Sequence, residues 1–451
     1  MKFDRMRELL LDQAIQGKLV PQLDSEPTVE QIGAAPKEVP FEIPAKWKWV
    51  NFDNLLKIIS GTSYSKNDIV DSSNDTAVRI MRGGNLRKGI VSTLNDDVFV
   101  NSGLHDLNKE VQNTDIVVVA STGSQTVIGR AAVYSGYESI QIGAFLRILR
   151  PKNKDFFPYL KYIFFSNYYI NHIRASAKGS NIKNLKQQYF SELYIPLPPL
   201  EEQKRIVAKL EKAFYEIERA EQAYNELQEL KDKLKSKILQ KAMEGKLVPQ
   251  LNSEPAVEQI GAAPKEVPFE IPAKWKWQKL DNALSFENGD RGSNYPAKSK
   301  LTHDSSSGHP FVSAGNLSNF KIDSNNLLYL SKEQLSKLRS GHIKNGDCLF
   351  CIRGSLGKFG FANQDGGAIA SSLVILRIND KNILKRSFLF YILQAPFFYK
   401  SMQNRKNGTA QPNLGAKELK EILIPLPPLE EQKRIVAKIE ALFEQIDRMQ
   451  G

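Results

Sequence analysis

The chain has 451 residues, enough for two or three domains that each bury a hydrophobic core. Its 62 lysines and arginines exceed its 50 acidic residues, and the net charge of +12 favours nucleic acid over an acidic membrane surface as a partner. No apolar run approaches the roughly 20 residues needed to cross a bilayer, and the start, MKFDRMRELL, is unlike a secretory signal. We therefore expect a cytoplasmic protein without a membrane partner.

A tandem duplication organises the sequence. Residues 19–49 return almost unchanged as residues 247–277, and residues 195–214 return as residues 424–443. The two segments between these blocks have diverged. Self-similarity of this kind predicts two copies of one structural unit, and the divergent segments predict two different binding tasks.

Residues 1–22 are predicted to form an N-terminal helical segment. LDQAIQGKLVPQ from Leu11 matches LQKAMEGKLVPQ from Leu239, so this segment corresponds to the end of the long helix predicted below. Together with the helix at the other end of the chain, it would complete a second helical spacer. The alternative is that both termini form isolated short helices, which are marginally stable without a packing partner.

Residues 23–194 contain the first divergent segment. Short apolar and β-branched runs alternate with Gly, Asn and Ser turns, and the aromatic stretch YLKYIFFSNYYINHI has the character of a core helix, so we expect a mixed α/β domain. Loop side chains that suit bases and phosphates are the candidates for nucleic-acid contact. They are Tyr64, Lys66, Arg82, Asn85, Arg87, Lys88, Ser121, Ser124, Gln125, Lys178, Ser180, Asn181 and Lys183.

Residues 195–250 are predicted to form the central helical spacer. Residues 201–245 are rich in Glu, Lys, Gln, Ala and Leu and lack proline and internal glycine, so they indicate one helix of roughly 65 Å. Apolar residues recur every three or four positions and predict a buried stripe that packs on other helices. The stripe consists of Val207, Leu210, Phe214, Ile217, Tyr224, Leu234 and Ile238.

Residues 251–423 contain the second divergent segment, which ends in the similar aromatic stretch FLFYILQAPFFYKSM. By the same reasoning as for the first segment, its candidates for nucleic-acid contact are Arg291, Asn294, Tyr295, Ser313, Asn316, Arg353, Ser355, Lys358, Lys406, Thr409, Gln411 and Asn413.

The two divergent segments share sparse marks in the same order, which predicts one fold for both. Gly61-x-x-Tyr64 matches Gly292-x-x-Tyr295, and Gly84-Asn85-Leu86 matches Gly315-Asn316-Leu317. An apolar strand follows Asp115 in one and Asp347 in the other, and residues 179–185 match residues 408–414.

The two cysteines, Cys348 and Cys351, form a C-x-x-C motif. They lie in the apolar run GDCLFCIRGS, which predicts a buried strand, and residues three apart in a strand point to opposite faces. The histidines show no spacing typical of metal ligands, so we expect neither a redox pair nor a zinc site.

Residues 424–451 are predicted to form the last helix, whose missing second half the N-terminal segment supplies. This gives an α+β fold in which two mixed α/β domains are separated by long antiparallel coiled-coil helices, circularly arranged with pseudo-two-fold symmetry. The apolar stripe of this second spacer comprises Val436, Ile439, Phe443 and Ile446 with Met6 and Leu10.

The basic charge is confined to the divergent segments. Residues 51–193 hold 17 basic and 12 acidic residues, residues 279–422 hold 20 and 11, and the remainder of the chain holds 25 and 27. A surface that binds phosphates needs this excess, whereas near-neutral helices suit protein contacts.

With these features the sequence resembles the specificity subunits of type I restriction-modification systems. The resemblance covers the whole chain and rests on the paired IPLPPLEEQKRIVAKLE-type blocks, the GKLVPQ segments and the P-x-x-W-x-W motifs at residues 44–49 and 272–277. It implies that 23–194 and 251–423 are target recognition domains that read two halves of a bipartite, asymmetric site in double-stranded DNA. It also implies that the helices set the half-site spacing and dock two methyltransferase subunits.

The same resemblance implies that catalysis belongs to other chains. S-adenosylmethionine would bind the methyltransferase subunits, and separate restriction and translocase subunits would cut DNA. The sequence agrees, because it lacks an Asn-Pro-Pro-Tyr-type methyltransferase motif and a G-x-x-x-x-G-K-[ST] phosphate loop. Two rival readings stay open: a self-contained enzyme that acts on DNA, and a scaffold whose paired domains bind proteins or acidic glycans.

Overall fold

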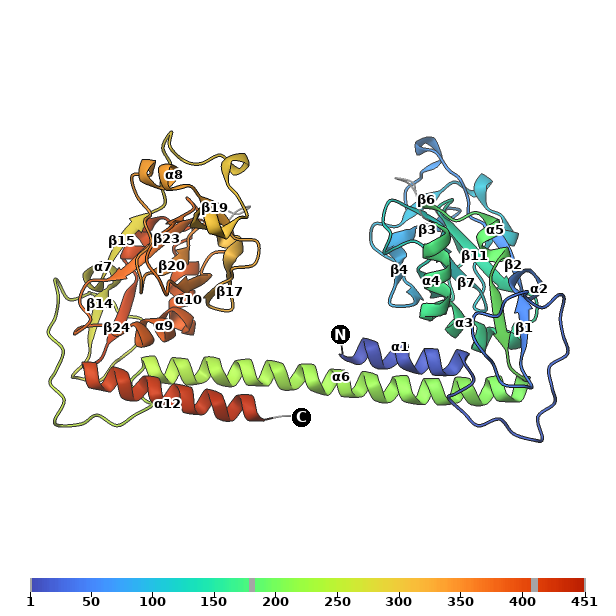
Figure 1. Ribbon diagram of the computed structural model, residues 1–451, viewed down its shortest axis with the longest axis horizontal. Coiled ribbons are helices and arrows are strands. Elements are labelled where there is room, and N and C mark those ends of the chain that lie inside the picture. The colour runs from blue at the N-terminus through green and yellow to red at the C-terminus, as the bar shows by residue number, and fades with distance from the viewer. Residues whose placement is uncertain (1, 178–182, 407–412, 450–451) are drawn as a thin grey trace. The chain divides into compact units, whose positions relative to one another are not determined.

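The computed structural model describes residues 2–177, 183–406 and 413–449 (Figure 1). Contacts within the chain divide it into two compact units, residues 1–223 and residues 224–451. In each unit a sheet domain packs on helices that come from the repeated blocks. The α+β class predicted from the sequence is confirmed.

The first unit holds the first sheet domain. Its six-stranded sheet has the order β2-β11-β7-β9-β5-β4, and β10-β3-β6 form a smaller sheet in which β10 and β3 run parallel. Two-stranded sheets pair β1 with β13 and β8 with β12. The strands are β1 (Lys48–Asn51), β2 (Leu56–Ser60), β3 (Val78–Met81), β4 (Leu86–Arg87), β5 (Ile90–Val91), β6 (Val98–Val100), β7 (Ile116–Val119), β8 (Ser121–Thr122), β9 (Ala131–Val133), β10 (Ile140–Ile142), β11 (Leu146–Pro151), β12 (Lys183–Asn184) and β13 (Tyr194–Leu197). The helices are α1 (Lys2–Ile15), α2 (Phe52–Leu55), α3 (Phe157–Phe165), α4 (Asn167–Ser176), α5 (Gln187–Ser191) and the start of α6 (Leu200–Met243), with short 3-10 turns η1 (Lys66–Asp68), η2 (Gly83–Asn85), η3 (Ser102–Leu104), η4 (Leu107–Lys109) and η5 (Lys154–Phe156).

The second unit repeats this plan with a smaller main sheet, β15-β23-β20-β21. The sheet β19-β16-β22 corresponds to β6-β3-β10, the hairpin β17-β18 to β4-β5, and the pair β14-β24 to β1-β13. The strands are β14 (Lys276–Lys279), β15 (Leu284–Asn288), β16 (His309–Val312), β17 (Leu317–Ser318), β18 (Lys321–Ile322), β19 (Leu328–Leu330), β20 (Cys348–Cys351), β21 (Phe359–Phe361), β22 (Ala368–Ile369), β23 (Leu373–Ile378) and β24 (Leu423–Leu426). The helices are α7 (Leu280–Ala283), α8 (Lys332–Lys337), α9 (Arg386–Gln394), α10 (Pro396–Gln403), α11 (Ala416–Lys420) and α12 (Leu429–Arg448), with 3-10 turns η6 (Lys298–Lys300), η7 (Ser305–Ser307) and η8 (Ala314–Asn316).

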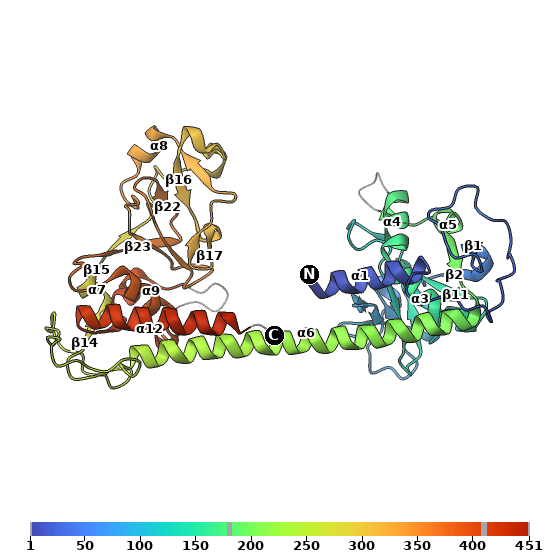
Figure 2. The ribbon, with the colours of Figure 1, turned by 60° about the horizontal axis from the view of Figure 1, so that its bottom comes forward.

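Both terminal helices pack on α6 inside their own unit. Helix α1 lies beside the first part of α6, and α12 lies beside its last part (Figures 1 and 2). Arg7 Nη2 lies 2.6 Å from Glu221 Oε2, and Lys235 Nζ lies 2.6 Å from Asp447 Oδ1. Over the described residues, the termini are therefore packed helices and not isolated ones, and the predicted helix 201–245 is confirmed as α6.

The apolar stripes of these helices, which were predicted to be buried, mostly pack in the cores of their own units. Side chains that are buried inside the chain leave no surface for a partner. Those buried are Val207, Leu210, Ile217, Val436, Ile439 and Ile446; Leu10, Phe214, Ile238 and Phe443 are half-buried; Met6, Tyr224 and Leu234 are exposed.

The same contacts join the repeated blocks in both units. The Arg205 guanidinium binds the buried Glu26 carboxylate with Nε and Nη2, and Arg434 binds Glu254 in the same way. Gly17, which follows α1, has a φ of 69°, and a Cβ there would overlap the ring of Pro44. In each unit the first repeated block thus contacts the second, and Gly245 with Pro272 repeats the packing of Gly17 with Pro44.

The two cysteines lie on opposite faces of β20, as predicted. Both are buried and free, and Cys348 packs in the core beneath α9 and α12, whereas Cys351 packs on the other side of the sheet. Burial raises the pKa of both thiols. The cysteines are core residues of the second unit. The predicted aromatic stretches form α3 and α4 in the first unit and α9 and α10 in the second, and most of their aromatic side chains are buried or half-buried.

Candidate nucleic-acid interface

The shared Gly-Asn-Leu mark is a structural turn, which corrects the assignment of its asparagines to DNA contact. Asn85 is 1% exposed; its Oδ1 accepts from the Arg82 amide, and its Nδ2 donates to Ser92 O and Asp97 Oδ1. Asn316 is also buried, and its Oδ1 accepts from the Ser313 amide. Both amides are engaged by the turn before the β4-β5 or β17-β18 hairpin.

Replacing Asn85 with alanine should therefore destabilise the first unit and not change DNA selectivity. The variant removes the hydrogen bonds that the Asn85 side chain makes with the Arg82 amide, Ser92 O and Asp97 Oδ1, which costs about 1–3 kcal/mol of unfolding free energy. Urea denaturation measures this loss. The matched control is Arg87→Ala in the adjacent hairpin, an exposed position where the expected loss is below about 0.5 kcal/mol.

The Gly-x-x-Tyr marks do not align as the sequence suggested. A Cβ on Gly61 would overlap the Gly143 carbonyl, and a Cβ on Gly289 would overlap the Ala370 carbonyl, so Gly61 corresponds to Gly289 and not to Gly292. The tyrosines do occupy similar places. Tyr64 packs against the core beside β3, and Tyr295 packs edge-on against Phe311 of β16. Three inserted residues thus separate glycine and tyrosine in the second domain.

Two marks far apart in sequence meet in both domains. In the first, Ser121 of β8 pairs with Asn184 of β12, and Leu185 N donates to Ala120 O at 2.7 Å. In the second, Arg353 forms a bridge with Asn413, and Leu414 N donates to Ile352 O at 3.0 Å. The strand that follows Asp115 or Asp347 therefore ends beside the matched segment near residue 184 or 413, and the candidates on both are brought together.

The other candidates lie on loops, turns and short strands of the two domains. In the first domain Lys66, Arg87, Lys88 and Gln125 are exposed, and Tyr64, Arg82, Ser121 and Ser124 are half-buried. In the second, Arg291, Asn294, Tyr295, Arg353, Ser355, Lys358 and Lys406 are exposed, and Ser313 and Asn413 are half-buried. Lys178, Ser180, Asn181, Thr409 and Gln411 lie outside the described residues, and only the backbone of Lys183 is described.

Some basic side chains are committed to the fold. Arg150 binds the buried Asp115 through Nε at 2.8 Å and Nη2 at 2.7 Å, and Arg377 binds Asp347 in the same way. The Asp347 carboxylate raises the pKa of Arg377 above its ordinary value. The aspartate that opens each shared strand is thus one half of a buried ion pair.

Two other guanidinium groups have no carboxylate partner in the part of the chain that the structure describes. Arg147 Nη1 donates to Ala144 O at 2.8 Å, and Arg291 Nη2 donates to Ser371 O at 3.3 Å. The sequence analysis missed Arg147 because it lies in β11 and not in a loop. Its signal is a charged residue in the strand LRILRP, whose remaining residues apart from Arg150 are apolar.

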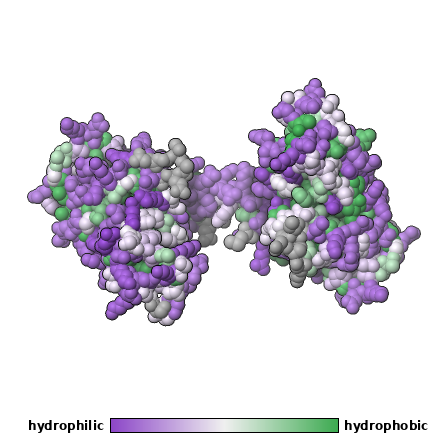
Figure 3. All heavy atoms as spheres, turned by 90° about the horizontal axis from the view of Figure 1, so that it is seen from above, coloured by the Kyte–Doolittle hydropathy of each residue, from purple (hydrophilic) through white to green (hydrophobic). Residues whose placement is uncertain are grey.

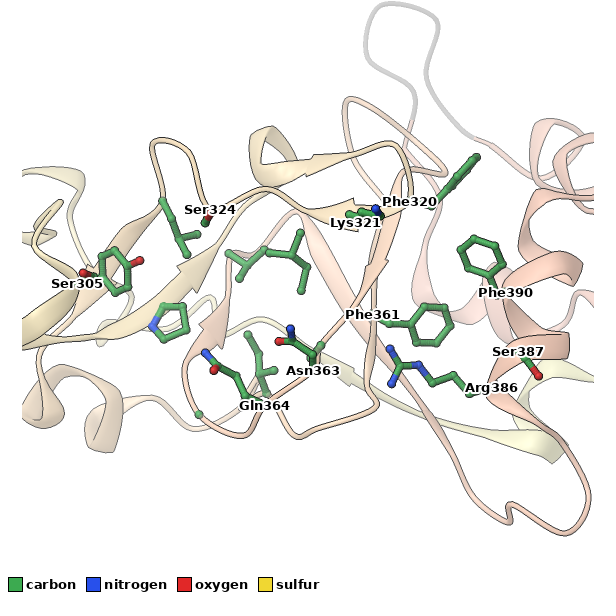
Figure 4. A pocket seen from close by; sticks show the side chains of 18 of the residues that line it. Ser305, Phe320, Lys321, Ser324, Phe361, Asn363, Gln364, Arg386, Ser387 and Phe390 are labelled. Atoms are coloured by element: carbon green, nitrogen blue, oxygen red, sulfur yellow. The ribbon is translucent and has the colours of Figure 1, made fainter. Parts of the chain in front are cut away.

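A hollow of about 1170 Å³ in the second unit is lined by aromatic and basic side chains (Figure 4). Phe320 and Phe390 lie with ring centroids 5.9 Å apart, and the Arg386 guanidinium lies 4.8 Å from the centroid of Phe361. None of the DNA-contact candidates that the structure describes lines it. The hollow is thus separate from the segments considered above.

The surface of both units is mainly polar on the face that Figure 3 shows, where hydrophilic side chains surround small apolar patches. Among the described residues, no three His, Cys, Asp or Glu side chains are grouped to hold a metal ion. Within that same part of the chain, no helix is long and apolar enough to span a bilayer.

Known proteins match this chain over most of its length. The family model for the type I restriction modification DNA specificity domain matches residues 44–229 and again residues 275–451. The type I restriction enzyme EcoKI specificity subunit of Escherichia coli (strain K12) is 26% identical over 91% of this chain and 84% of that protein. The MjaVIII specificity subunit of Methanocaldococcus jannaschii is 25% identical over 90% of this chain and 88% of that protein.

A solved structure shares the fold. It is described as "Structural basis underlying complex assembly and conformational transition of the type I R-M system", and it has a TM-score of 0.60 at 21% identity over 91% of this chain and 93% of that chain. The family model covers both sheet domains, α6 as far as residue 229 and the whole of α12. The chain therefore belongs to the family of type I restriction-modification DNA specificity subunits.

Proposed function

We propose that the two sheet domains read the two halves of one bipartite, asymmetric DNA site. The observation that carries this proposal is a duplicated frame around two divergent, basic domains. Residues 51–193 have an excess of basic over acidic residues, 17 against 12, and residues 279–422 have a larger one, 20 against 11. The nearly identical repeated blocks would perform the same structural task in both units, whereas different loops on a cationic domain suit different base sequences.

The helices would set the spacing between the half-sites and dock two methyltransferase subunits. Two readers on one face of B-DNA must engage positions about 34 Å apart, or a multiple of that distance. Helix α6 is continuous over 44 residues, and the terminal helices brace it within each unit. Among the exposed apolar side chains on these helices, Met6, Tyr224 and Leu234 belong to the predicted stripes and are the candidates for docking.

The chain would not catalyse methyl transfer or cleavage. The methyltransferase subunits would bind S-adenosylmethionine and flip an adenine from each half-site out of the duplex. Restriction and translocase subunits would join the same complex. The absence of methyltransferase and phosphate-loop motifs from the full sequence supports this division of tasks.

Sequencing of methylated adenines in cells with and without this chain tests the proposal. Both halves of one split motif should appear with the chain and vanish together without it. The purified chain alone, incubated with duplex and labelled S-adenosylmethionine, should transfer no methyl group. A motif that persists without the chain, or methyl transfer by the chain alone, would overturn the proposal.

A further inference from the structure

The main chain gives an exact correspondence between the two domains at the turn before β11 and β23. Phe145 O accepts from the Ala120 amide at 2.8 Å, and Ser372 O accepts from the Ile352 amide at 3.0 Å. Ala120 and Ile352 hold matching places, because each also accepts the amide of the matched leucine, Leu185 or Leu414. Ala144, which precedes Phe145, therefore corresponds to Ser371.

In both domains a guanidinium group donates to the carbonyl oxygen at this place, Ala144 O or Ser371 O, but the arginine comes from a different element in each. In the first domain it comes from Arg147, the second residue of β11. In the second it comes from Arg291, in the loop after β15. By strand register, the place of Arg147 is taken by Val374 in the second domain. The arginines are thus unrelated in sequence and share only their position in space.

Neither arginine has an ion-pair partner among the described residues, unlike Arg150 on β11 and Arg377 on β23. Burial lowers the pKa of Arg147, and burial followed by repulsion from Arg353 lowers the pKa of Arg291. A partly desolvated guanidinium without a carboxylate is an uncompensated charge, which an anion would stabilise.

The DNA-contact candidates lie next to these arginines. Phe145 O also accepts from the amide of Ser121, whose strand β8 pairs with β12. In the second domain the Ile352 amide, directly before Arg353, donates to Ser372 O beside the carbonyl that Arg291 contacts, and Arg353 Nε donates to Asn413 Oδ1 at 3.3 Å. Each arginine therefore adjoins the two segments that meet at residue 184 or 413.

We propose that Arg147 and Arg291 each bind a backbone phosphate of the DNA duplex, at matching places in the two half-sites. This inference rests on the proposed function. The two domains have diverged elsewhere, yet a guanidinium group occupies the same place in both, although it comes from different positions in the sequence. Such a group is expected to bind a feature that both half-sites share. Phosphates are common to every half-site, whereas base edges are not.

The test measures how binding of the full chain to duplex DNA depends on salt. The probes are a 40-base-pair duplex that carries the methylated motif and one of scrambled sequence. Arg147→Gln and Arg291→Gln should each reduce the slope of log affinity against log salt by about 0.9, and the double variant by about 1.8. Affinity for both duplexes should fall by the same factor, so that the preference for the motif is unchanged.

Three further variants and a stability measurement complete the design. Lys209→Gln removes one exposed charge from α6 and should leave the slope unchanged. Arg147→Lys and Arg291→Lys keep the charge and should retain the wild-type slope with a weaker affinity, which also covers the case in which a glutamine variant fails to fold. Thermal unfolding checks that each variant is folded, since a purely structural role would lower stability without changing the slope.

An unchanged slope in the folded glutamine variants would overturn the phosphate contact. A loss of preference between the two duplexes would also overturn it, because it would indicate contact with a base. Failure of the proposed function is a separate result: the wild-type chain would then bind both duplexes equally.

Discussion

Replacing Arg150 with alanine is expected to lower the unfolding free energy of the first unit by about 3–5 kcal/mol, because it leaves a buried carboxylate unpaired. Asp115 is fully buried and accepts two bonds from Arg150 and one from the Gln112 amide. Arg150 also donates to Glu110 O at 2.7 Å. The arginine thus joins β11 to β7 and to the loop before it, at the centre of the main sheet.

The second unit supplies the matched control. Arg377→Ala should have the same effect on β20 and β23 and should leave the first unit unchanged, because Arg377 pairs with Asp347. Hydrogen exchange of the full chain measures both, since protection should fall in β7 and β11 for one variant and in β20 and β23 for the other. The double variant Asp115→Asn with Arg150→Met removes both charges and should recover most of the loss. Equal protection in Arg150→Ala and the wild type would contradict the expectation.

The frame of this fold was predictable because local patterns encode it. Helix α6 follows from a proline-free run with an apolar stripe, and the match between α1 and the end of α6 follows from the repeat. The C-x-x-C strand was also predictable, because alternation alone places its two thiols on opposite faces. The spacing of apolar residues did not reveal what each apolar stripe packs against. Most of the stripe residues pack on the sheet domain of their own unit.

The details of the binding segments were less predictable, because long-range pairing determines them. Gly61 and Gly292 were matched by motif, but three inserted residues move the true counterpart to Gly289. Asn85 has a suitable side chain for adenine, yet the turn uses its amide completely. Residue type indicates what a side chain can bind, and only the fold shows whether its polar atoms are still available.

Arg147 is the opposite case, in which the sequence did not indicate a side chain whose polar atoms are available. Nothing local distinguishes it from Arg150, three residues later in the same strand. Arg150 has a buried aspartate as its partner, whereas Arg147 donates to the carbonyl oxygens of Ala144 and Leu146. The difference arises from the register of β11 against β2 and β7 and from the turn before it.

A chain that carries the first sheet domain in both frames is expected to direct methylation to two copies of one half-site. The variant replaces residues 278–423 with residues 50–194. The joints lie in matching strand pairs, because Trp49 faces Pro196 in β1-β13 and Trp277 faces Pro425 in β14-β24. Both tryptophans also pack edge-on against a phenylalanine, Phe41 or Phe269, with ring centroids 4.9 Å apart.

Sequencing of methylated adenines in cells that express this variant measures the outcome. The half-motif of the second domain should disappear completely, and the half-motif of the first should occur twice. The reciprocal chain, with residues 278–423 in both frames, is the control and should give the opposite half-motif twice. An unchanged asymmetric motif would show that selectivity resides in the frame and not in the sheet domains. The repeated blocks bind one another through Glu26–Arg205 and Glu254–Arg434, and none of these four residues is exchanged. The exchange should therefore leave the helices intact and change only the DNA sequence that is recognised.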